Sequence, residues 1–128
     1  MKKLFRKLFP SKEMRAYRKT HRRHRKELIK LAKQDRDFDY GWLYDFTIMK
    51  IKHMYEYFSE GNNVWQSEES LNEILAQLKH VLELHEELDN LLDTDGDTKG
   101  YLDRLKREQE LYEEIYSYIG KYIQWWWD

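Results

Sequence analysis

Apolar side chains recur every three or four residues through most of this chain, which is the spacing of one face of an α-helix. The clearest run spans residues 71–92 and is marked by Leu71, Ile74, Leu78, Val81, His85, Leu88 and Leu92. Ser67 precedes this run in the position of an N-cap, and Glu68 and Glu69 follow at the positive end of the helix dipole. The pattern therefore predicts a helix that begins directly after Ser67.

A first helix is predicted to follow the break at Pro10, with Ser11 as its N-cap and an end near Lys33. Its inner face carries Met14, Tyr17, His21, His24, Leu28 and Leu31. The segment before the proline is basic and amphipathic, but it is too short to hold a helix alone in water, so we do not expect it to rest on a membrane surface. We predict residues 1–10 as a separate arm and residues 11–128 as one helical domain.

Two more helices complete the pattern, one from about Tyr40 to Glu60 and one from about Thr98 to Trp126. The inner face of the earlier one is Tyr40, Leu43, Phe46, Ile51, Met54 and Phe58. That of the later one is Tyr101, Leu105, Glu108, Tyr112, Ile115, Ile119 and Tyr122. Long helices with short connectors pack as antiparallel neighbours. The expected fold is all-α, an antiparallel helical bundle of about four helices with a basic N-terminal arm.

The composition agrees with a single helical domain. The chain has 128 residues, and its one proline and five glycines leave few places to break long helices. It has no cysteine, so disulfides and thiolate metal sites are excluded. No apolar run approaches the roughly 20 residues that a transmembrane helix needs.

Charge is distributed very unevenly along the chain. Residues 1–34 carry fourteen Lys or Arg against two Glu, a net charge of +12, whereas residues 35–128 carry nine against twenty-two Asp or Glu, a net charge of −13. The candidate contact residues of the first helix are Arg15, Arg18, Lys19, Arg22, Arg23, Arg25, Lys26 and Lys30. They suit the phosphates of a nucleic acid or an acidic protein surface. The alternative is internal neutralisation, with this helix docked against the acidic third and fourth helices.

The aromatic C-terminus is the second strong feature. On a helix, Trp125, Trp126 and Trp127 would point about 100° apart, so one core cannot bury all three. We expect at least one of them to form an interface, in a homo-oligomer or with a partner, or to be covered by residues 1–10. A core role with hydroxyl groups in water is expected for Tyr112, Tyr116 and Tyr122.

Three helices each carry a His-x-x-Glu step, a spacing that places an imidazole and a carboxylate on one helical face. The steps are His24/Glu27, His53/Glu56 and His80/Glu83. We expect these faces not to converge, because His24 lies on an inner face whereas His80 and Glu83 lie off the apolar stripe of their helix. No metal site and no cofactor are therefore predicted.

Two acidic steps resemble the Mg²⁺-binding pairs of all-α nucleotide pyrophosphatases. They are Glu83/Glu86 and Glu110/Glu113, and both are expected to face solvent. The segment Asp93–Asp97 begins like a calcium loop, but Thr98 and Arg104 stand where such a loop has glycine and glutamate. We interpret it as a polar turn between helices.

Two segments and the C-terminus resemble those of a group of small uncharacterised tailed-phage proteins. The stretch from Asp37 to Leu43 opens D-x-D-aromatic, Met54 to Phe58 reads M-x-x-Y-F, and the chain ends W-W-D. The resemblance covers about half the chain and brings no activity with it. It implies a viral protein made in the cytoplasm of a bacterial host, where it could also become associated with the virion.

Taken together, these features predict a non-enzymatic phage-type helical interaction protein that engages nucleic acid or an acidic protein partner through its basic helix. No phosphate-binding loop and no Ser-His-Asp or Cys-His set can be assembled from the residues. Two alternatives stay open. One is a host-directed inhibitor that blocks a bacterial defence nuclease or similar machine, and the other is a pyrophosphatase-like enzyme.

Overall fold

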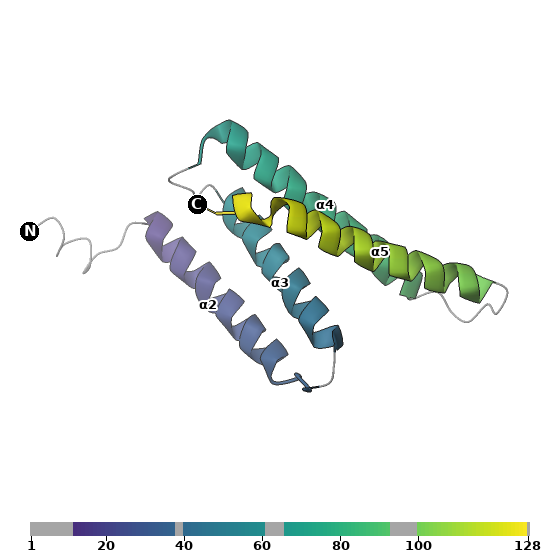
Figure 1. Ribbon diagram of the computed structural model, residues 1–128. Helices are drawn as coiled ribbons and strands as arrows, with labels where there is room; N and C mark the ends of the chain where they lie inside the picture. The colour runs from purple at the N-terminus through teal and green to yellow at the C-terminus, as the bar shows by residue number, and fades with distance from the viewer. Residues whose placement is uncertain (1–11, 38–39, 61–65, 93–99, 128) are drawn as a thin grey trace, which may run out of the picture.

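A computed structural model of the chain describes residues 12–37, 40–60, 66–92 and 100–127 (Figure 1). The long helices are α2 (Lys12–Ala32), α3 (Tyr40–Ser59), α4 (Glu68–Leu92) and α5 (Tyr101–Tyr122), and a 3-10 turn, η2 (Ile123–Trp125), follows α5. The described residues contain no strand, so the predicted all-α bundle is confirmed. The predicted arm, the cap at Ser11 and the polar turn Asp93–Asp97 lie outside the described residues.

The helices pack in chain order, α2 on α3, α3 on α4 and α4 on α5 (Figure 1). In this arrangement α2 lies at one edge of the bundle, with α3 between it and the α4–α5 pair. None of the four described helices combines the length and apolar character that crossing a bilayer requires.

The core is built around α4, as its regular spacing predicts. The buried side chains of α4 are Ile74, Leu78, Val81, Leu84 and Leu88. Its N-cap is also confirmed, because the backbone N–H of Ser70 donates to Ser67 Oγ at 3.2 Å. Around α4 are packed Tyr44, Ile48, Ile51 and Phe58 of α3, and Leu111, Ile115 and Ile119 of α5.

The inner faces of α3 and α5 differ in part from the predicted ones. Tyr40 and Leu43 are 76% and 58% exposed, and Tyr44 is buried in their place. Because α3 is apolar around much of its circumference, spacing alone does not define its inner face. In α5 the prediction missed Leu111, and Tyr101 is exposed because the first turns of α5 extend beyond α3 (Figure 1).

The fourth helix ends earlier than predicted. The α-helix stops at Tyr122 instead of Trp126, and the chain tightens into η2, where the Trp126 N–H donates to the carbonyl oxygen of Ile123 at 3.1 Å. Trp126 is 6% exposed, whereas Trp125 and Trp127 are 59% and 57% exposed. The expectation that one core cannot bury all three is confirmed, although they do not share a helix.

Candidate functional site

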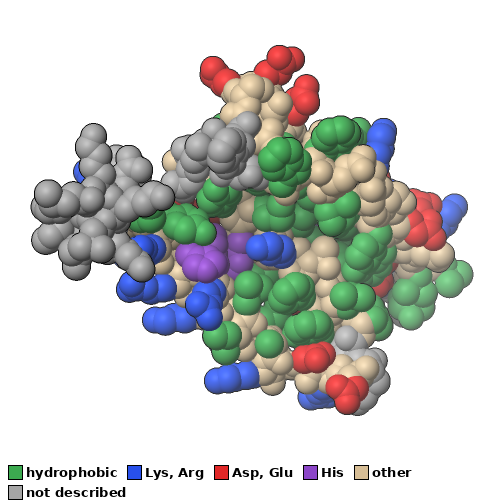
Figure 2. All heavy atoms as spheres, turned by 60° about the vertical axis from the view of Figure 1, so that its left-hand side comes forward, with side chains coloured by type: hydrophobic (Ala, Val, Ile, Leu, Met, Phe, Trp, Pro, Cys, Tyr) green, Lys and Arg blue, Asp and Glu red, His purple; other side chains and the backbone are tan. Residues whose placement is uncertain are grey.

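Seven of the eight candidate basic residues of α2 form an exposed face turned away from α3. They are Arg15, Arg18, Lys19, Arg22, Arg25, Lys26 and Lys30. Within the described parts of the chain, none of the seven forms an ion pair or a side-chain hydrogen bond. Figure 2 shows Lys and Arg side chains gathered at the lower left, beside the histidines. This face presents its positive charge to solvent.

The eighth residue, Arg23, is engaged inside the protein. Its guanidinium donates to Glu27 of the same helix at 3.2 Å and to Glu56 of α3. Hydrogen bonding to Glu56 is the main reason that the pKa of Arg23 is raised. Arg23 therefore holds α2 against α3, unlike its seven neighbours.

The alternative of internal neutralisation by the acidic helices is wrong for the described residues. Arg23 of α2 pairs with Glu27 of α2 itself and with Glu56 of α3. The described ion pairs of α4 and α5 lie within these two helices or join them to each other. Arg107 of α5 bridges Glu87 of α4 at 2.7 Å and Glu110 of its own helix at 3.4 Å. The fold separates the basic helix from the acidic ones by interposing α3.

Two of the three His-x-x-Glu steps meet where α2 packs on α3, and the expectation that these faces do not converge is wrong for this pair. His24 Nε2 lies 2.9 Å from Glu56 Oε2, and His53 Nε2 lies 2.7 Å from Glu27 Oε2. Each helix thus supplies an imidazole to the carboxylate of the other. The two rings stack between these bonds, with centroids 3.9 Å apart and planes 9° apart. We call these four residues the His–Glu cluster.

The electrostatics of the His–Glu cluster favour a neutral His53 ring and charged carboxylates. Burial is the main cause that lowers the pKa of His53, and the nearby His24 and Lys50 lower it further. The hydrogen bond from His53 lowers the pKa of Glu27, and the bond from His24 lowers that of Glu56. The neutral His53 ring donates its Nε2–H to Glu27, and the two stacked rings then do not both carry positive charge.

Metal binding is not supported by these groups. The ring Nε2 atoms are directed at carboxylates, and His53 Nδ1 is buried without a hydrogen-bond partner. Within the described residues no group of three or more His, Asp or Glu side chains is arranged to hold a metal ion. The acidic steps predicted to face solvent do so, since Glu83, Glu86, Glu110 and Glu113 are exposed.

Another histidine, His85 of α4, links α4 to α3. Tyr44 Oη lies 2.7 Å from His85 Nδ1, and His85 Nε2 lies 3.2 Å from Asp89 Oδ2. Burial raises the pKa of Tyr44 and lowers that of His85, so a neutral phenol donates to a neutral ring. Tyr44 is buried, and this Tyr–His–Asp line therefore stabilises the core.

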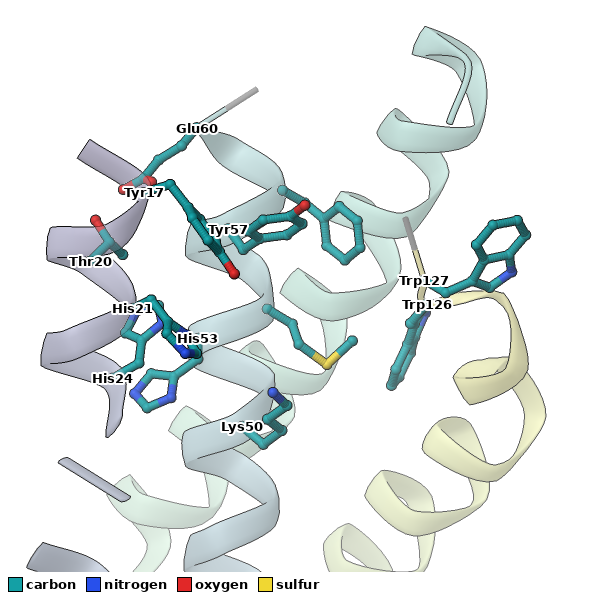
Figure 3. Close-up of a pocket in the computed structure, with 12 residues that line it drawn as sticks. Tyr17, Thr20, His21, His24, Lys50, His53, Tyr57, Glu60, Trp126 and Trp127 are labelled. Atoms are coloured by element: carbon teal, nitrogen blue, oxygen red, sulfur yellow. The ribbon is translucent and has the colours of Figure 1, made fainter. Parts of the chain in front are cut away.

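A groove of about 360 Å³ opens beside the His–Glu cluster (Figure 3). Tyr17 and His21 of α2 form one wall, and Lys50 and Tyr57 of α3 contribute the floor. Trp126 and Trp127 lie across from α2, with the ring of Trp127 pointing away from the groove. We call this the aromatic groove. The sequence prediction missed it, because its walls come from three segments that only the packing of the helices brings together.

The C-terminal tryptophans divide into one core residue and two surface residues. Trp126 packs in the core, and its Nε1–H donates to Gln77 Oε1 at 2.9 Å. Trp125 and Trp127 expose large apolar surface, in keeping with their predicted contact role, which stays a prediction. The tyrosine prediction is confirmed for Tyr112 and Tyr122, which pack partly buried against the core, and wrong for Tyr116, which is exposed.

Comparison with protein families, with curated proteins and with solved structures returns no match for this chain. The geometry of the residues is therefore the basis for assigning a function.

Proposed function

We propose that this protein is a non-enzymatic binding protein that holds nucleic acid by phosphate contacts along the exposed face of α2. The observation that supports this is the row of seven basic side chains that are exposed and have no carboxylate partner in the described chain. From its resemblance to tailed-phage proteins, we further propose that it acts in the cytoplasm of an infected bacterium.

The character of the face favours nucleic acid over an acidic protein. Stable protein interfaces have an apolar centre surrounded by polar groups. The described part of α2 exposes the large apolar side chains of Met14, Tyr17 and Ile29. Of these, Ile29 alone lies within the basic face by helical spacing, so the face lacks an apolar centre. A phosphate backbone requires only positive charge along a line, and the 21 residues of α2 extend for about 30 Å.

Binding should depend steeply on salt. If several of the seven cations each neutralise a phosphate, a plot of log affinity against log salt for duplex DNA should slope by about −0.9 per contact, approaching about −6. Fluorescence anisotropy of a labelled duplex between low and physiological salt measures this slope. No binding at low salt would contradict the proposed function.

Reversing charge on the face should remove binding without unfolding the protein. The triple variant Arg15→Glu, Arg22→Glu and Lys26→Glu should weaken duplex binding at least tenfold at low salt, since three attractive contacts become repulsive. The matched control reverses three exposed lysines on α4 and α5, Lys79, Lys106 and Lys121, and so has the same net charge.

The comparison of the two triple variants locates the binding surface. The control should keep most of the wild-type affinity, and circular dichroism should show equal helix content in all three proteins. Equal losses in both variants would mean that net charge alone drives binding and that α2 is not the interface.

A further inference from the structure

One edge of the basic face forms the rim of the aromatic groove. Arg18, His21 and Arg25 follow one another at spacings of three and four, which places them in a row along one side of α2. His21, the middle member, lines the groove, and Lys50 adds an exposed ammonium from α3. The cationic side chains that could bind phosphates therefore lie directly beside the aromatic groove.

The groove offers flat aromatic surfaces at this rim. The Tyr17 ring stacks on His21 with centroids 5.7 Å apart and planes 15° apart, and it meets Tyr57 edge-on at 5.9 Å. Tyr17 remains 37% exposed. Trp127 contributes to the far rim of the groove, but its indole ring points away from Tyr17 in Figure 3, so Tyr17 is the aromatic ring available for stacking.

We propose that the aromatic groove receives an unpaired base of single-stranded nucleic acid while neighbouring phosphates contact Arg18, Arg25 and Lys50. This inference rests on the proposed function and specifies its ligand as a single strand. Bases stack on aromatic side chains whatever their sequence, and cations beside the stack hold the backbone. The volume of the groove lies within the range of about 300–1,000 Å³ that small-molecule pockets have.

A duplex cannot use the groove in this way. Its bases are paired and stacked, and extruding one of them costs a few kcal/mol. A duplex would therefore contact only the cations on the outer face of α2. The groove should consequently distinguish single strands from duplexes of equal charge.

The test compares a labelled oligothymidine of about 12 nucleotides with a short duplex carrying the same number of phosphates, by anisotropy at low salt. Tyr17→Ala should weaken binding of the single strand about 5- to 100-fold, because it removes a stacking surface, and should leave duplex binding nearly unchanged. Trp125→Ala is the control, because Trp125 is an exposed aromatic side chain that does not line the groove. Tyr17→Phe, which keeps the ring, should retain single-strand binding.

The outcomes separate this inference from the proposed function. If the wild type binds neither probe, both fail. If it binds both probes and Tyr17→Ala weakens neither, the face binds phosphates but the groove does not receive a base. If polyglutamate displaces the labelled single strand at a lower concentration than unlabelled single strand does, the groove binds an acidic peptide instead, and the inference is overturned. Thermal melts of each variant confirm that a loss of binding is not a loss of fold.

Discussion

Replacing Trp126 by alanine is expected to lower the free energy of unfolding by about 3–5 kcal/mol, the usual cost of truncating a large buried aromatic side chain. Trp126 is buried in the core, and its indole N–H donates to Gln77. The substitution therefore leaves a cavity and also removes a hydrogen bond. Urea denaturation followed by circular dichroism measures the loss.

Trp125→Ala and Trp127→Ala serve as controls for this prediction. Both side chains are more than half exposed, so each substitution should change the free energy of unfolding by about 0.5 kcal/mol or less. Sedimentation of the same variants tests the contact role, because an interface residue alters assembly at unchanged stability. If all three variants lose similar stability as strict monomers, neither Trp125 nor Trp127 forms an interface.

The parts of the fold that the sequence predicts correctly are those where local spacing is unambiguous. In α4 the apolar positions alternate with charged ones, and Leu78, Val81 and Leu88 are all fully buried. In α3 the apolar residues surround the helix, and the choice between Leu43 and Tyr44 depends on where α4 lies. A single helix does not contain that information.

The candidate site divides in the same way. The basic face of α2 follows from helical spacing, and the exposure of Arg15, Arg22 and Lys26 was predictable. The His–Glu cluster and the aromatic groove were not, because both depend on the rotation of α2 about its axis relative to α3. Two identical His-x-x-Glu spacings on successive helices were the one available signal. Taken together, the two spacings are compatible with crossed hydrogen bonds between the helices as well as with a metal site.

Acidification is expected to release α2 from α3 before the rest of the bundle unfolds. Among the described residues of α2 only His24 is buried, whereas α4 buries five apolar side chains, so α2 is the least stably held helix. The titratable contacts that attach it to α3 are the His–Glu cluster and Arg23, beside the bond from Trp42 Nε1–H to the carbonyl oxygen of Leu31 at 3.0 Å, which does not titrate. The His–Glu cluster and the Arg23 bridges require charged carboxylates, and the stacked pair is favoured by a neutral His53 ring.

The direction of the pH effect follows from the pKa shifts. The pKa of His53 is lowered from its ordinary 6.5, so the unfolded chain binds this proton more readily, and the stability that the neutral ring contributes is lost as pH falls below 6.5. The pKa values of Glu27 and Glu56 are lowered from 4.5, so their contribution is present above that pH and lost below it. All three shifts make acid destabilise the contact between α2 and α3, first through the histidine and then through the carboxylates.

Hydrogen exchange between pH 7 and pH 4, corrected for the intrinsic exchange rate, should therefore show protection disappearing from α2 while it persists in the centre of α4. Burial also lowers the pKa of His85 between α3 and α4, so protection in α4 should decline as well, but later, because its apolar packing does not titrate. In a His53→Gln variant, α2 should be less protected at pH 7 and should respond less between pH 6.5 and pH 5, since the titrating ring is gone. Simultaneous loss of protection in α2 and α4 in the wild type would show that the His–Glu cluster does not control a separate step, and that α2 unfolds only with the bundle.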